Sequence, residues 1–247
     1  MRRVERRRPN RGAATARVAG QNVLYSDRLL HCGLSRIIPR VTPEQLEALD
    51  VYLSELLRWA PRVNLTGLKS KEAIVREGFL RSLTYRAAFE PAPGMKAVDI
   101  GSGAGFPGLV LKICYPELDM LLIEAARRRA TFLRHLIRQL GLTGVRCLQA
   151  RAEQLHNDAE HRGRYHIAFA RAVGALPYVV PLVEPLLSAG GRLILRMGRR
   201  TAESVEAARP RLSASGMRAE VYEAPAVDEG GPPTELLVVD KVARRAL

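Results

Sequence analysis

The stretch that most limits how this chain can fold runs from Ala97 to Gly108 and reads AVDIGSGAGFPG. Residues 97–100 are mostly apolar and predict a short buried strand, and the apolar residues 109–114 predict the start of a helix. Between them glycine recurs at alternate positions, where the absence of a Cβ permits positive φ and lets a ligand approach the backbone. A strand, a glycine-rich turn and a helix N-terminus form a nucleotide-binding βα unit.

The last three glycines of this stretch have the spacing of a dinucleotide fingerprint: Gly103, Gly105 and Gly108. That fingerprint binds a pyrophosphate through free N–H groups at the start of the helix. Pro107 lacks one such donor, although it suits the first turn of a helix. The sequence therefore permits a nicotinamide-dependent oxidoreductase but does not favour one.

The first three glycines, Gly101, Gly103 and Gly105, follow Asp99 and look like motif I of the S-adenosylmethionine methyltransferases. In that motif an acid near the strand end helps to hold the cationic, amino-acid end of the cofactor. Asp99 would repel a pyrophosphate and suits a sulfonium, so it favours this second interpretation. A tight turn without a ligand is the third, and it also stays open from the residues alone.

The composition narrows the class of protein. A chain of 247 residues predicts one large domain, or one with a small extension, and a net charge of +14 predicts an anionic partner, with nucleic acid first. An arginine-rich surface without a partner is the alternative. The three cysteines, Cys32, Cys114 and Cys147, lack metal-ligand spacing and fit a reducing cytoplasm without a metal site. No apolar run is long enough to span a membrane, and no secretory signal is recognisable.

The chain divides into three parts. Residues 1–40 begin with seven arginines and one glutamate in the first twenty positions, which predicts a disordered basic arm and a lead-in. Residues 41–94 predict an N-terminal helical extension, and residues 95–247 predict the main domain. The arm either binds nucleic acid or is inert.

Helical periodicity marks the extension. Thr42 predicts an N-cap, Pro43 the first helical position and Gln45 a capping box. The expected apolar face of this helix, which ends near residue 60, is Leu46, Leu49, Leu53, Leu56 and Leu57. A second helix is expected over residues 71–89, with Ile74, Val75, Phe79 and Leu83 on its buried face.

Alternating strands and helices follow and predict a mostly parallel sheet. A helix that ends at Gly141 is expected after the second strand, a kinked segment with three prolines over 175–188, and a further helix over 201–215. The expected strands are 97–100, 119–124, 145–149, 165–170, 191–197, 217–222 and 235–241. Seven strands that end in a hairpin resemble the class I methyltransferases (an α/β, Rossmann-like fold), in which the last strand is usually antiparallel.

Further site residues are expected at the strand ends. Glu124 ends the second strand, roughly 20 residues past the glycines, where an acid can hydrogen-bond a ribose hydroxyl. Ala152 and Glu153 follow the third strand on the adenine side, and Arg171 follows the fourth. The chain lacks both the Asn/Asp-Pro-Pro-aromatic motif of exocyclic-amine methyltransferases and the Pro-Cys pair of cytosine C5 enzymes. Guanine N7 needs neither a base nor a nucleophile, so it fits as the target.

The chain resembles a known family in its motifs. Asn64–Thr66 (NLT), Asp99–Gly108 (DIGSGAGFPG), Arg151–Glu153 (RAE), Phe169–Ala172 (FARA) and Gly198 look like those of the glucose-inhibited division B family. These bacterial enzymes methylate a guanine N7 in small-subunit (16S) ribosomal RNA. The resemblance implies cytoplasmic S-adenosylmethionine-dependent catalysis on ribosomal RNA or the small subunit, without a metal. It implies cofactor contacts by Gly101, Phe106, Ala152, Glu153 and Arg171, and assigns catalytic roles to Arg171 and Asn64.

Three motifs depart from the family pattern. The usual His-x-x-Asp-Ser of the second helix is Gly78 to Ser82, with Arg81 in place of the Asp, and the usual Leu-Lys-Gly of strand five is Arg196-Met197-Gly198. The residue after Glu124 is alanine, where the family usually has serine. The alternatives are a methyltransferase of another RNA or a small molecule, a nicotinamide-dependent oxidoreductase and a non-catalytic RNA-binding protein. The sequence leaves the oligomeric state open, with a monomer favoured.

Overall fold

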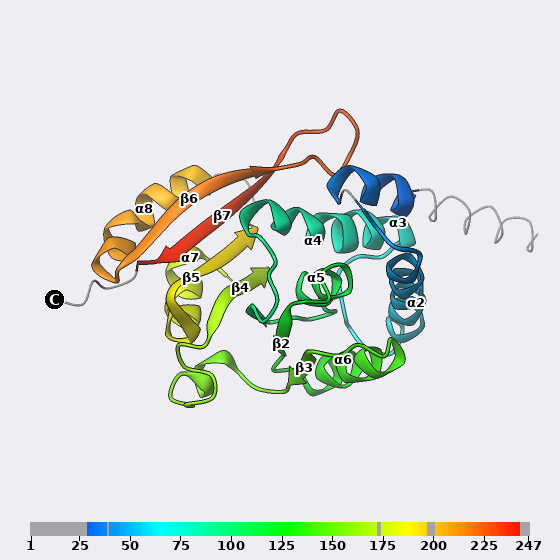
Figure 1. Cartoon of the computed structure of the whole chain (residues 1–247), viewed down its shortest axis with the longest axis horizontal. Coiled ribbons are helices and arrows are strands. Elements are labelled where there is room, and N and C mark those ends of the chain that lie inside the picture. Colours follow the sequence, from blue (N-terminus) through cyan, green and yellow to red (C-terminus); the bar gives the residue numbers. More distant parts are fainter. Residues whose placement is uncertain (1–28, 39, 172–173, 197–200, 243–247) are drawn as a thin grey trace, which may run out of the picture.

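A computed structural model describes residues 29–38, 40–171, 174–196 and 201–242 of the chain. Its centre is a seven-stranded sheet in the order β3-β2-β1-β4-β5-β7-β6 (Figure 1). The strands are β1 (Lys96–Ile100), β2 (Asp119–Ile123), β3 (Val145–Leu148), β4 (Tyr165–Arg171), β5 (Leu187–Arg196), β6 (Met217–Ala224) and β7 (Thr234–Lys241).

The sheet is mostly parallel, as the alternating pattern predicts. β1 pairs in parallel with β2 and β4, and the outer pairs β2–β3 and β4–β5 are parallel too. β7 is antiparallel to both of its neighbours, β5 and β6. This confirms the expected α/β class I methyltransferase fold, including the antiparallel last strand. Residues 197–200 lie outside the described residues, so the predicted end of strand five at 197 cannot be compared.

Two hydrophobic cores cover the two faces of the sheet. On one face, Ala97, Phe169 and Ile194 pack against the helical segment 71–88 and against α2 (Pro43–Trp59), α5 (Gly108–Cys114) and α6 (Arg127–Gln139). On the other face, Val98 and Ala168 pack against α7 (Leu176–Val183) and α8 (Thr201–Ala214). Figure 1 shows this arrangement, with α7 and α8 on one side of the strands and the remaining helices on the other. The N-terminal extension therefore shares a continuous core with the sheet.

The helix α2 (Pro43–Trp59) begins as its sequence predicts. The Thr42 hydroxyl accepts a hydrogen bond from the Gln45 N–H, and the Gln45 side chain accepts one from the Thr42 N–H, which is a complete capping box. Its buried face differs at two positions from the expected one. Tyr52 is fully buried, with its hydroxyl against the glycine-rich turn, whereas Leu57 is 40% exposed.

The segment 71–88 is helical throughout but not one regular helix. It consists of α3 (Lys71–Ala73), the π-helical η1 (Ile74–Leu80), α4 (Arg81–Leu83) and the 3-10 turn η2 (Thr84–Ala88). At its widest turn the Arg81 N–H donates to the Arg76 carbonyl, five residues back. The prediction of one regular helix over 71–89 is therefore wrong, because the segment changes its helical type three times. All four residues of its expected core face are nevertheless buried.

The helices that come after β1 each follow a strand. α5 (Gly108–Cys114) follows β1, α6 (Arg127–Gln139) follows β2, and the 3-10 turn η3 (Ala152–Leu155) follows β3. Gly141, at φ +60°, ends α6 as expected. The proline-rich segment breaks as expected into α7 (Leu176–Val183) and the 3-10 turn η4 (Glu184–Leu186). Strand β5 then begins at Leu187, four residues earlier than predicted, and α8 (Thr201–Ala214) follows it.

Candidate functional site

The glycine-rich turn lies between β1 and α5 and needs glycine at three positions. Gly101, Gly103 and Gly105 have φ values of +68°, +58° and +104°, which side chains with a Cβ rarely adopt. Gly101 is exposed at the end of the sheet, and around Gly103 the nearest heavy atom to an added Cβ would be the Gly101 carbonyl oxygen at 3.7 Å. Gly105, by contrast, is closely packed. The Gly101–Gly103 side of the turn is therefore open to a ligand.

The N–H groups of this turn are already used by the chain itself. Gly101 and Ser102 donate to the Ile123 carbonyl, and Gly105 and Phe106 donate to the Ser102 carbonyl. The N–H groups of the other two fingerprint glycines donate to carboxylates. Gly103 N–H donates to Glu124 at 2.9 Å, and Gly108 N–H donates to Asp99 at 3.1 Å. A pyrophosphate needs such donors free, so this geometry disfavours a dinucleotide.

Asp99 is fully buried beneath the turn. Its Oδ2 accepts the Gly108 N–H, and its Oδ1 has no hydrogen-bond partner. Burial raises the pKa of this carboxyl to about 7, against the hydrogen bond from Gly108. An unsatisfied buried carboxylate oxygen costs free energy, and a cationic or hydrogen-bonding ligand beside it would recover that cost. Asp99 and the open turn thus fit the positively charged end of S-adenosylmethionine.

Glu124 is buried at the end of β2 and connects three segments. One carboxylate oxygen accepts the Gly103 N–H and the other accepts the Ala126 N–H at 2.8 Å. The Arg129 guanidinium lies 3.9 Å from the same carboxylate and donates at 3.1 Å to the carbonyl oxygen of Asn64. The structure therefore brings Asn64 to the glycine-rich turn, with its side chain exposed.

Phe106 and Arg171 lie together on the side of the turn that faces the extension. The Phe106 ring is stacked on Tyr52 and meets Phe79 edge-on, with ring centroids 5.8 and 5.9 Å away. The Arg171 guanidinium carbon lies 5.7 Å from the Phe106 ring centroid. The ring of Phe106 is thus held in the core by the extension, and Arg171 stands at the end of β4 over it.

The two predicted residues after β3 begin the turn η3. Ala152 is buried and Glu153 is exposed, at the carboxyl end of the strand that adjoins β2. The carboxyl ends of β1, β2, β3 and β4 thus carry all the predicted cofactor residues along one edge of the sheet, where ligands bind in open α/β sheets. Ala172, Met197 and Gly198, which the sequence pattern also singles out, lie outside the described residues.

Three residues of this region are missed by the expected site. Tyr52 donates from its hydroxyl to the Ala104 carbonyl at 2.6 Å and so fastens the turn to α2. Gly78 lies against the Phe106 ring, where an added Cβ would come within 2.7 Å of Cζ. Tyr85 is fully buried, and its hydroxyl has no hydrogen-bond partner. Helical spacing after Leu49 could have identified Tyr52 as a core residue, but no local signal indicates what it touches.

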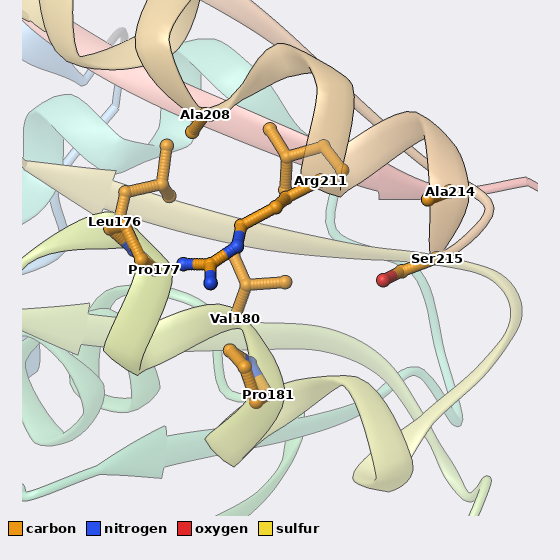
Figure 2. Close-up of a pocket in the computed structure, with 9 residues that line it drawn as sticks. Leu176, Pro177, Val180, Pro181, Ala208, Arg211, Ala214 and Ser215 are labelled. Atoms are coloured by element: carbon orange, nitrogen blue, oxygen red, sulfur yellow. The ribbon is translucent and has the colours of Figure 1, made fainter.

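A separate hollow of about 410 Å³ lies between α7 and α8 (Figure 2). The Arg211 side chain extends from α8 across it toward α7. No residue that lines it comes from the glycine-rich turn or from the ends of β1 and β2, so it is not the proposed cofactor site.

The described part of the chain lacks both a membrane-spanning helix and a metal-binding group of side chains. None of its helices is both long enough and apolar enough to cross a membrane. Among the same residues, no three His, Cys, Asp or Glu side chains are grouped so that they could hold a metal ion.

Comparisons with known proteins agree with this geometry. Residues 45–229 match the family model GidB, described as rRNA small subunit methyltransferase G. Two relatives carry the name ribosomal RNA small subunit methyltransferase G. That of Roseiflexus sp. is 41% identical, over 83% of this chain and 86% of its own, and that of Chloroflexus aggregans is 40% identical, over 78% and 80%. A crystal structure of a Corynebacterium glutamicum protein is similar in fold, with a TM-score of 0.52, 18% identity and coverage of 80% and 92%.

Proposed function

Because the chain belongs to the GidB family, rRNA small subunit methyltransferase G, we propose that it transfers a methyl group to guanine N7 in small-subunit (16S) ribosomal RNA. It is an S-adenosylmethionine-dependent enzyme of the class I fold. The observation that carries the proposal is the pair of buried carboxyls, Asp99 and Glu124, which occupy the N–H groups of the turn. They leave a site suited to a cation rather than to a pyrophosphate.

The cofactor, when bound, supplies an electrophilic methyl group on a sulfonium. We propose that Asp99, Gly101, Gly103 and Gly105 border its amino-acid end, and that Glu124 accepts a ribose hydroxyl with a free lone pair. The other proposed cofactor contacts are Phe106, Ala152, Glu153 and Arg171. The N7 atom carries a lone pair and no proton, so the chain needs to position the base in line rather than to remove a proton.

Arg171 and Asn64 are the proposed catalytic residues. Arg171 follows β4, next to the strand that bears the glycine-rich turn, so a base placed there would meet the methyl group. Asn64 lies across the turn, with its side chain exposed and its backbone carbonyl held by Arg129. We propose that residues 95–247 form the catalytic domain, that 41–94 form the extension that covers it, and that the enzyme acts as a cytoplasmic monomer.

Calorimetric titration with S-adenosylmethionine, S-adenosylhomocysteine and NADH tests the cofactor. Transfer of labelled methyl groups to unmodified small subunits and to stripped RNA tests the reaction. We expect Arg171→Ala to lose activity by about tenfold or more, since one charge-assisted contact is worth roughly 1.5–3 kcal/mol, while Arg209→Ala, in a surface ion pair of α8, retains it. Binding of NADH without either methionine cofactor would refute the proposal.

A further inference from the structure

A group of arginines next to the proposed site has more positive charge than the chain neutralises. Arg81 of α4 and Arg196 at the end of β5 share one carboxylate, that of Glu77 in η1. Its oxygens lie 2.7 Å from Arg81 Nη2 and 3.7 Å from Arg196 Nη2. We call Arg81, Arg171 and Arg196 the arginine cluster. Arg171 and Arg196 are register partners on β4 and β5, and Arg81 and Arg196 share Glu77, so the three cations lie close together. Burial and the charges of Arg81 and Arg171 lower the pKa of Arg196.

A second arginine of β5 shows what a compensated guanidinium looks like in this fold. Arg192 lies four residues before Arg196 on the same face of the strand, with nearly the same exposed fraction (28% against 30%). Arg192 binds both oxygens of Asp240 at 2.6 and 3.0 Å and the Ala88 carbonyl at 2.7 Å. Within the described residues, the only ion pair of Arg196 is the long contact to the shared Glu77.

Two further polar groups in the cluster are left without a partner. The Nε of Arg81 is buried and makes no hydrogen bond, and the Tyr85 hydroxyl is likewise unpartnered. The Tyr85 ring meets that of Phe169, two residues before Arg171 on β4, edge-on with centroids 6.0 Å apart. Burial raises the pKa of Tyr85, against the charges of Arg171 and Arg196. Tyr85 is fully buried, whereas the Arg81 and Arg196 side chains are partly exposed, so an outside acceptor can reach the guanidinium groups. Guanidinium groups with so few partners fit an acceptor with more than one oxygen.

The position of the cluster identifies the acceptor. All the predicted cofactor residues except Arg171 lie at the ends of β1, β2 and β3, whereas Arg171 and Arg196 end β4 and β5, on the other side of β1. An anion on this half of the sheet edge lies on the side of the target rather than of the cofactor. Guanidinium groups bind phosphate oxygens in bidentate geometry. Resting on the proposed function, we propose that Arg81 and Arg196, with Arg171 beside them, bind a backbone phosphate of the RNA close to the methylated guanine.

The salt dependence of RNA binding tests this site. Fluorescence anisotropy with a fragment of stripped small-subunit RNA gives the dissociation constant at several salt concentrations. We expect Arg196→Gln and Arg81→Gln each to raise Kd by about tenfold or more and to lower the log–log slope by about 0.7, the value of one phosphate contact to a single strand. Arg196→Lys should retain most of the slope. The affinity for S-adenosylmethionine should not change.

Two variants separate this site from general effects of charge or folding. Arg86→Gln is the matched control. Arg86 lies on the same helical segment as Arg81 and is 30% exposed, as Arg196 is, but it is paired with Glu90 and lies beside Tyr115. It should leave slope and Kd as they are. Glu77→Gln removes the internal competitor and should tighten RNA binding, an effect that loss of a structural ion pair would not produce.

An unchanged slope in Arg196→Gln would overturn the phosphate site. So would a loss of cofactor affinity with the RNA slope intact, because the anion would then be the carboxylate of the cofactor. If no RNA is methylated by the wild type while the slope still differs between Arg196→Gln and Arg86→Gln, the proposed reaction fails and the phosphate site stands. If the wild type methylates RNA but the slopes of the two variants are identical, the proposed reaction stands and the phosphate site fails.

Discussion

Gly105→Ala should show that the hydroxyl of Tyr52 fixes the glycine-rich turn. An alanine Cβ at this position would overlap Tyr52 Oη and lie 3.2 Å from atoms of Leu109 and Leu133. The backbone conformation, φ +104°, would add about 1–2 kcal/mol of strain, and the overlap about 1–3 kcal/mol. Displacement of Tyr52 would also break its bond to the Ala104 carbonyl, worth about 1 kcal/mol. We expect Gly105→Ala to lower the free energy of unfolding by a total of about 3–6 kcal/mol.

A double-mutant cycle with Tyr52→Phe isolates the hydroxyl. Tyr52→Phe alone should cost about 1 kcal/mol, since only one hydrogen bond is lost. In the double variant the overlap is absent, and the cost consists of the strain of φ and the one lost hydrogen bond. The combined cost should therefore be at least about 2 kcal/mol below the sum of the single costs.

Urea denaturation measures each free energy of unfolding. The matched control is Gly141→Ala, which has φ +60° but no atom within 4 Å of the added Cβ. Its cost should be the strain alone, about 1–2 kcal/mol, and should add to that of Tyr52→Phe within about 0.5 kcal/mol. If the cost of Gly105→Ala also added to that of Tyr52→Phe within about 0.5 kcal/mol, the role assigned to the hydroxyl would be refuted.

Three other predictions concern buried groups around the sheet. A carboxyl whose folded pKa is about 7 binds its proton more tightly than the unfolded chain does. The free energy of unfolding should therefore fall by up to about 4 kcal/mol as the pH rises from about 4 to about 7. Asp99→Asn should lack this fall in pH-dependent denaturation. Parallel pH curves for the variant and the wild type would contradict the prediction. Gly78→Ala should push Phe106 away and cost about 1–3 kcal/mol, with weaker cofactor binding by calorimetry; an unchanged melting temperature would disprove the close packing. Lys112→Met should lower the free energy of unfolding in urea by roughly 1.5–3 kcal/mol, because the buried Lys112 Nζ donates to the carbonyls of Pro116 and Leu118. Its cofactor affinity should stay constant. A variant as stable as the wild type would show that water replaces the ammonium.

The sequence predicts most of the fold because the signals for it are local. Apolar runs mark each strand, and the Thr42–Gln45 capping box marks the start of α2 to the residue. Glu124 is likewise predictable, because a parallel strand after a βα unit ends at the same edge as the glycines. The burial of Glu124 and its two backbone hydrogen bonds are consistent with that prediction.

What could not be predicted depends on how the extension lies against the sheet. The Tyr52 hydroxyl meets Ala104 across 52 residues of sequence, and Arg196 meets Glu77 across more than twice that distance. Leu57 has the right spacing for a buried face but points outward, since periodicity gives a stripe and not its partner. Two members of the arginine cluster, Arg81 and Arg196, are visible in the sequence only as departures from a family pattern, without a sign that they meet Arg171 in space.

The wide turn at Ile74–Leu80 sets the rotation of everything that follows it in the extension. Each residue of an α-helix advances about 100° around the axis, so one additional residue in a turn rotates the remaining segment by that angle. Arg81 and Tyr85 therefore face the sheet edge only while the extra residue is present. Shortening this turn by a single residue would leave composition and helicity almost unaltered, yet it would turn both side chains away from β5. The number of residues in this segment, as well as their chemistry, therefore determines which side chains face the sheet edge.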